Sequence, residues 1–269
     1  MSGSVIHSQS AAMVPAVYSA GQSAQLPVAI DYPAALALRQ MSMVHDELPK
    51  YLLAPEVSAL LHYVPDLRRK MLLATLWNTG ARINEALALT RGDFSLTPPY
   101  PFVQLATLKQ RTEKAARTAG RTPAGQQTHR LVPLSDSWYV SQLQTMVATL
   151  KIPMERRNKR TGRTEKARIW EVTDRTVRTW IGEAVAAAAA DGVTFSVPVT
   201  PHTFRHSYAM HMLYAGIPLK VLQSLMGHKS ISSTEVYTKV FALDVAARHR
   251  VQFAMPESDA VTMLKNRHA

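Results

Sequence analysis

Residues 200–207, TPHTFRHS, place two histidines on either side of an arginine at the start of a predicted helix. Thr200 is a good N-cap residue, and Pro201 suits the first helical position because its missing N–H is not needed there. His202 and Arg205 therefore lie in the first turns, where backbone N–H groups and the helix dipole favour an anion. An arginine in such a place is typical of a phosphate site.

Two other interpretations of this helix stay open from the stretch alone. His202 and His206 have the i, i+4 spacing of a zinc helix, but such helices carry a glutamate after the first histidine, and Thr203 stands there. The chain has no cysteine that could complete a metal site. A capped helix with surface histidines is the plainer alternative. We expect neither a metal ion nor a cofactor.

The composition narrows the class of protein and of partner. The chain has 269 residues, of which 46% are hydrophobic, and this is enough for a globular domain with a core. A formal net charge of +12 and a pI near 10.1 favour a polyanionic partner, with double-stranded DNA as the first candidate. No apolar run approaches a membrane span and no secretory signal is visible, so we expect a cytoplasmic protein with no membrane partner.

Apolar periodicity and capping signals predict a mainly α fold with a small antiparallel β-sheet (α+β). Residues 1–48 are expected to form a partly flexible N-terminal extension that includes a short helix at 33–45. The main globular domain is expected at 49–250, followed by a tail or docking segment at 251–269. Helices are predicted over 55–64, 66–80, 82–89, 137–150, 173–191 and 200–215, and from Pro218 and Ser232, with strands over 102–109 and 129–134.

Basic residues concentrate in the middle of the chain. Between Lys109 and Arg168 there are 14 Lys or Arg and 4 Asp or Glu, spread over the polar loop 110–128 and the run 151–168. Such a run is either a solvated basic face or a surface that contacts phosphates. On the second interpretation, the expected DNA contacts are Arg111, Lys114, Arg130, Arg156, Arg157, Lys159 and Arg160.

Four further segments add residues that suit phosphate chemistry. Arg82 follows a glycine in 79-TGARINEAL-87, and Lys109 ends a predicted strand. His228 follows Gly227 in 226-MGHKS-230, and Tyr237 lies in 232-SSTEVYTKV-240. Ser232 and Glu235 are spaced as a capping box, which predicts Tyr237 on the second turn of a helix.

Together these residues resemble the tyrosine recombinases, also called phage integrases, over about residues 51–250. Arg82, His202, Arg205, His228 and Tyr237 stand in the family's order. The gaps also agree, at three residues from His202 to Arg205, 23 from Arg205 to His228 and nine from His228 to Tyr237. More narrowly, the chain resembles the plasmid-borne resolvases of this family.

The resemblance implies a site-specific recombinase that cuts and rejoins DNA through a covalent 3′-phosphotyrosine. Tyr237 would be the nucleophile, and it would keep the energy of the broken phosphodiester in the new bond. Arg82 and Arg205 would clamp the non-bridging oxygens of the phosphate, and His228 would add a donor.

The resemblance also implies the proton transfers. His202 would assist Tyr237 as general base, and a strand lysine would protonate the leaving 5′ oxygen. Lys109 is the best match to that lysine and Lys114 is second. Glu85, one turn beyond Arg82, would support the arginine as an acceptor. His206 and His211 are expected to be structural.

Two alternative functions differ in class. A non-catalytic DNA-binding regulator could use 204–228 as a helix-turn-helix, and a type IB topoisomerase would share the chemistry without choosing a site. As a recombinase, the chain is expected to act as a homotetramer on two DNA sites. The stretch before Tyr51 is too short for the helical core-binding domain of most family members, so accessory DNA-binding proteins are possible partners.

Overall fold

The computed structural model describes residues 27–28, 30, 32–44, 48–106, 129–158 and 160–249, together with 256, 258, 259 and 263. Within these ranges the fold is mainly helical with a small antiparallel sheet, which confirms the predicted class. No described helix is both long and apolar enough to cross a membrane. The elements are α1 (Tyr32–Val44), α2 (Ala54–His62), α3 (Leu67–Thr79), α4 (Ile83–Leu87), a 3₁₀ turn (Arg91–Asp93), β1 (Phe94–Ser95), β2 (Phe102–Ala106), β3 (His129–Pro133), α5 (Ser137–Thr149), β4 (Glu155–Arg157), β5 (Thr164–Lys166), α6 (Asp174–Ala190), α7 (Pro201–Tyr214), α8 (Leu219–Met226) and α9 (Ser232–His249).

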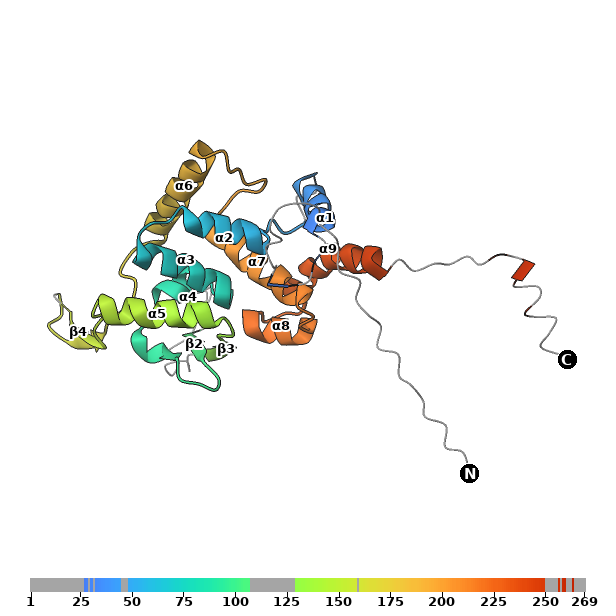
Figure 1. Ribbon diagram of the computed structural model, residues 1–269. Coiled ribbons are helices and arrows are strands. Elements are labelled where there is room, and N and C mark those ends of the chain that lie inside the picture. The colour runs from blue at the N-terminus through green and yellow to red at the C-terminus, as the bar shows by residue number, and fades with distance from the viewer. Residues whose placement is uncertain are drawn as a thin grey trace, which may run out of the picture.

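Helix α3 forms the centre of the body and packs against α2, α5 and α7 (Figure 1). Its run from Met71 to Leu76 is buried on every side. Asp66 caps the start, where its carboxylate accepts the N–H of Arg69 at 2.8 Å. Gly80 ends the helix at φ 59°, and a Cβ there would collide with the Tyr208 ring on α7. Glycine thus allows α3 and α7 to lie close together.

Strands β1, β2 and β3 form one antiparallel sheet in that order. Val103 pairs with Val132, and Leu105 pairs with Arg130. Alternate residues of β3 are buried, as expected for a sheet with one face on the core. Arg130 occupies one of these inward positions, so its side chain points into the protein.

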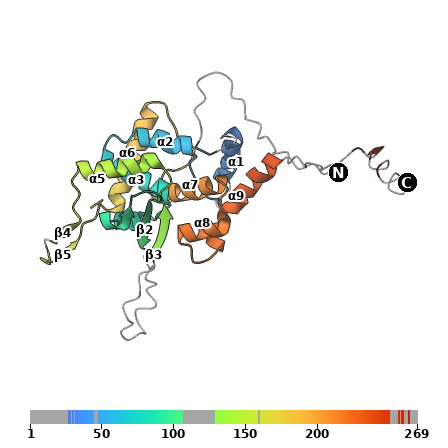
Figure 2. The same ribbon diagram turned by 60° about the horizontal axis from the view of Figure 1, so that its bottom comes forward.

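A second, two-stranded sheet is formed by β4 and β5 inside the basic run 151–168. This hairpin projects from the end of the body opposite α8 and α9 in both views (Figure 2). The sequence did not predict it, because ERR and TEK lack the alternation of apolar residues that indicates a strand. Glu155 lies opposite Lys166, and Arg156 lies opposite Glu165, so side chains of opposite charge stand at facing positions of the hairpin.

Helix α1 packs against α9, so an early and a late part of the chain lie side by side (Figures 1 and 2). A second buried cluster joins Ala35 of α1 to Tyr208 of α7, Met226 of α8 and Tyr237 of α9. Arg39 of α1 is also buried, and it bonds the carboxylate of Glu56. The predicted short helix at 33–45 is therefore confirmed, and it is part of the same body.

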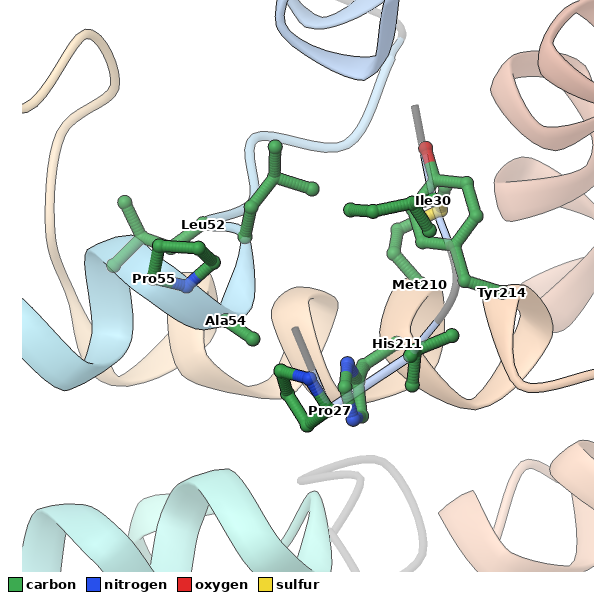
Figure 3. A pocket seen from close by; sticks show the side chains of 10 residues that line it. Pro27, Ile30, Leu52, Ala54, Pro55, Met210, His211 and Tyr214 are labelled. Carbon is green, nitrogen blue, oxygen red and sulfur yellow. The ribbon is translucent and has the colours of Figure 1, made fainter. Parts of the chain in front are cut away.

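The segment around Pro27 and Ile30 closes a small apolar cavity against α7 (Figure 3). His211 and Tyr214 of α7 face it from the other side. The space inside is about 10 Å³, which is roughly the room of one water molecule. The His211 ring lies 4.8 Å from the Trp77 ring, as suits the structural role expected for this histidine.

Candidate active site

A cavity of about 260 Å³ brings together the start of α4, the start of α7 and the outer face of α6. The cavity is lined by Arg82, His202 and Arg205. These residues lie up to 123 positions apart in the sequence (205 − 82). Arg178 of α6 lines the cavity as well. We call this cavity the arginine pocket. Three guanidinium groups around one cavity favour an anion with several oxygens, such as a phosphodiester.

Arg205 is the buried arginine of the pocket. Its guanidinium donates to the carbonyl of Gly80 and, at 2.7 Å, to the carbonyl of Met226. Burial, followed by the charge of Arg82, lowers the Arg205 pKa to about 10. The side chain therefore stays charged at neutral pH, and it links the end of α3 to the end of α8. These bonds fix the guanidinium before any ligand binds.

Arg82 is the N-cap residue of α4, and its side chain is 41% exposed. Glu85 accepts from the Arg82 backbone N–H and from its guanidinium, each at 2.9 Å. Glu85 therefore holds Arg82 in place, and its supporting role in the reaction stays a prediction. Because Glu85 holds only part of the guanidinium, the exposed remainder can donate to a ligand in the pocket.

Arg130, which was expected to contact DNA, points into the protein instead. Its guanidinium is buried and donates to both oxygens of Glu85, at 2.6 and 3.2 Å, and to the Leu225 carbonyl at 2.9 Å. Glu85 consequently binds two arginines at once. Burial alone would raise the Glu85 pKa, but the hydrogen bonds and charge of Arg130, together with the hydrogen bonds from Arg82, hold the pKa below its ordinary value.

His228 follows the left-handed Gly227 that ends α8. Its Nδ1 lies 2.8 Å from the Thr234 hydroxyl, which fixes the ring at the start of α9. Burial, with the charge of Arg205 next, lowers the His228 pKa to about 4. The neutral ring can hold a proton on one nitrogen and donate a hydrogen bond from it.

Tyr237 lies on α9 and is only 2% exposed. Its hydroxyl lies 2.9 Å from Nδ1 of His206, not beside His202 as expected. The His202 ring stacks on the His206 ring, with centroids 5.8 Å apart. Burial raises the Tyr237 pKa to about 12, although the charges of Arg205 and Arg82 act to lower it. The positive charges of both arginines therefore favour the ionised form of the phenol.

Several expected residues fall elsewhere. Lys109, Arg111, Lys114 and Lys159 lie outside the described residues. On the hairpin, Arg157 and Arg160 are exposed, whereas Arg156 forms ion pairs with Glu165 and Glu171. Ser232 is the first residue of α9 and was predicted as its N-cap; its N–H donates to the Ser230 hydroxyl at 3.2 Å. Tyr237 still lies on the second turn.

Two residues of the site were missed from the sequence. His206 shares a helical face with His202, and the family pattern directed attention to the first of them. Arg178 is one of 31 Lys or Arg residues, and no motif marks it. Only the packing of α6 beside α4 brings Arg178 to the pocket. Among the described residues, no group of three or more His, Cys, Asp or Glu side chains could hold a metal ion.

Comparison with known proteins agrees with this geometry. Residues 50–243 match the family described as "Phage integrase family". A resolvase of Escherichia coli (strain K12) is 97% identical over 265 residues, which cover 98% of this chain and 99% of that protein. A probable site-specific recombinase in the afa region of Escherichia coli is 46% identical over 94% of this chain and 96% of its own length.

Tyrosine recombinase XerD of Mycobacterium leprae is 33% identical over 72% of this chain and 57% of its own. The crystal structure of XerA recombinase superimposes with a TM-score of 0.54 at 20% identity, over 77% of this chain and 65% of that chain. XerH recombinase, solved on its difH substrate before cleavage, gives 0.51 at 19% identity, and the match covers 71% of this chain and 51% of XerH. These two structures agree in fold. The chain thus belongs to the phage integrase family and is a site-specific tyrosine recombinase.

Proposed function

We propose that this recombinase cuts one DNA strand with the hydroxyl of Tyr237 while Arg82 and Arg205 hold the scissile phosphate in the arginine pocket. The observation that carries the proposal is electrostatic. Both guanidinium groups face one cavity, and both act on the pKa of the phenol. A phosphate bound between them would therefore lie within the same field as the nucleophile, where charge developing in the transition state is stabilised.

The chemistry balances without an external energy source. The phenolic oxygen forms a bond to phosphorus, and the bond from phosphorus to the 5′ oxygen breaks. Lys109, or Lys114 in its place, gives a proton to the departing oxygen. His228 donates to a non-bridging oxygen beside Arg205. Attack by the 5′ hydroxyl of another strand reverses these steps and releases Tyr237.

The surroundings of the pocket suggest how DNA would lie on the protein. Arg178 lines the pocket from α6, and Arg157 and Arg160 extend from the β4–β5 hairpin at one end of the body. We assign these three as phosphate contacts, together with Arg111, Lys114 and Lys159 from the sequence. Arg156 contributes less, since two glutamates already neutralise it.

Strand exchange joins two duplexes, so four protomers are needed on two sites, each cutting one strand. We assign this chain to such a tetramer in the cytoplasm, with accessory DNA-binding proteins as further partners. The segment 251–269 would dock on a neighbouring protomer. The domain division at 49–250 follows from the same assignment, with α1 packed onto it.

A nicked suicide substrate that carries the recombination site tests the proposal. Wild-type protein is expected to form a covalent adduct that survives denaturation, and Tyr237→Phe is expected to bind the DNA without forming it. An adduct on the variant would remove Tyr237 as the nucleophile. Adduct formation on any sequence would favour a type IB topoisomerase, and binding without an adduct in wild type would favour a regulator.

A further inference from the structure

The side chains of His206 and Tyr237 meet in the interior between α7 and α9. Nδ1 of the histidine lies 2.9 Å from the phenolic oxygen, and the two ring centroids are 5.6 Å apart. The tyrosine is buried, and among the described residues the structure gives its oxygen no second hydrogen-bond partner. The proposed nucleophile is therefore held by one histidine.

The direction of this hydrogen bond follows from the charges. Burial, with His202 and Arg205 nearby, lowers the His206 pKa to about 4, whereas burial raises the Tyr237 pKa to about 12. At neutral pH the imidazole carries one proton and the phenol keeps its own. The buried O–H needs an acceptor, and Nδ1 is the atom in reach, so the phenol donates and the ring proton lies on Nε2.

We propose that His206 positions Tyr237 for attack and that its Nδ1 takes the phenolic proton as the bond to phosphorus forms. In this step the O–H bond of Tyr237 breaks, the oxygen–phosphorus bond forms and His206 becomes a cation. The departing 5′ oxygen still receives its proton from the lysine. The inference rests on Tyr237 being the nucleophile, and it moves the general base one helical turn along from His202.

His202 is less well placed for that role. Its ring stacks against His206 and forms no hydrogen bond to Tyr237. It lines the arginine pocket, which neither His206 nor Tyr237 does. His202 is therefore suited to the phosphate side of the reaction.

His206 also has a route by which to lose the proton again. It lines an open cavity of about 390 Å³, separate from the arginine pocket, together with Thr200, His202 and Val236. Solvent in this cavity can accept the proton from Nε2 of the imidazolium, and the low pKa of the ring favours the release. The titratable or charged groups that face His206 are His202 and Arg205 on α7, Tyr237 on α9, His228 before α9 and Lys50 across the cavity.

Two variants separate positioning from proton transfer. His206→Ala removes both, and we expect adduct formation under single-turnover conditions to slow by about 10²–10⁴-fold, the range of general base catalysis. His206→Asn places an amide oxygen near the position of Nδ1, so it can accept the hydrogen bond but not keep the proton. Its rate is expected to lie between those of wild type and His206→Ala. His211→Asn, on the same helix beside Trp77, serves as the control and should react like wild type.

The pH profile gives the decisive readout. The wild-type rate should be flat between about pH 6 and 8, because neither His206 nor Tyr237 titrates there. In both His206 variants the rate should rise about tenfold per pH unit, because solvent must then remove the proton. DNA retention and thermal unfolding of each variant show that it is folded.

Three results would overturn the proposal. One is a His206→Ala rate within about threefold of wild type. Another is a slower rate with the same flat profile in His206→Ala and His206→Asn, which marks a purely structural histidine. The third is a tenfold slope in His202→Ala with none in the His206 variants, which returns the base to His202. An adduct in Tyr237→Phe would instead overturn the nucleophile, so the two failures are distinguishable.

Discussion

Arg130 and Glu85 form a bidentate ion pair inside the protein, with the guanidinium nitrogens 2.6 and 3.2 Å from the two carboxylate oxygens. The same carboxylate binds Arg82, whose outer side faces the arginine pocket. A residue on β3 thus fixes the acceptor that orients a residue on α4. The pair belongs to the support of the site, and it gives the first two predictions.

Arg130→Ala should destabilise the fold. Removing one partner of a buried pair leaves the other charge unpaired, which costs about 3–5 kcal/mol. Urea unfolding at pH 7 measures the loss. Arg157→Ala on the exposed hairpin is the matched control and should change stability by no more than about 0.5 kcal/mol. Unchanged stability of Arg130→Ala, with a shallower salt dependence of DNA binding, would return Arg130 to the DNA surface.

Glu85 should make the stability depend on pH in the acid range. Its pKa is lower in the folded protein than the ordinary value of 4.5, so its contribution is present above about pH 4.5 and is lost as the pH falls through the folded pKa. Glu85→Gln should therefore be less stable than wild type at pH 7. The gap between their urea midpoints should narrow as the pH falls from 5 to 3, and a gap that is constant over this range contradicts the assignment.

Arg178→Ala should weaken DNA binding and slow cleavage. Since this guanidinium lines the arginine pocket, we expect the slope of log affinity against log salt to fall by about one and the single-turnover rate to drop at least tenfold. Arg175→Ala, on the same helix and exposed but not lining the pocket, should leave the cleavage rate unchanged. Equal effects of the two variants would indicate a general charge effect of α6.

Lys109→Ala should lose cleavage because the leaving oxygen receives no proton. A substrate with sulfur at the 5′ bridging position should restore it, since a thiolate leaves without protonation. Lys114→Ala should cleave both substrates at similar rates. Rescue of Lys114→Ala instead would move the acid to Lys114.

Deleting residues 257–269 should leave binding to a single site nearly intact and sharply reduce synapsis and cleavage. The apolar face of the expected helix 258–268 is too short to fold alone, so it needs a groove on another surface. Gel shifts with one and two sites measure the two effects separately. Full recombination by the truncated chain would contradict a docking role.

Local signals predicted most of the fold. The Asp66 cap, the left-handed Gly80 and the Thr200–Pro201 start each act within a few residues, so the sequence contains all the information they need. The same holds for β3, the strand that carries Arg130. The β4–β5 hairpin was not predicted, because its strands carry no apolar alternation.

Contacts between distant segments set the limit of prediction at the site. Whether Arg130 points inward depends on the register of β3 and on Glu85, 45 positions earlier. Which histidine of α7 reaches Tyr237 depends on how α9 docks, 31 positions after His206. Helical spacing places His202 and His206 on one face and cannot choose between them.

Because α1 packs against α9, the fold can be completed only after α9 has been synthesised. Val44 and Ser232 are 188 positions apart (232 − 44), so a ribosome working at about 5–20 residues per second needs roughly 10–40 s to travel between them. Throughout that interval α1 lacks its contacts with α9. The helix that carries Tyr237 follows α1 to α8 in the chain, so a nascent chain acquires the proposed nucleophile only after these elements have been made.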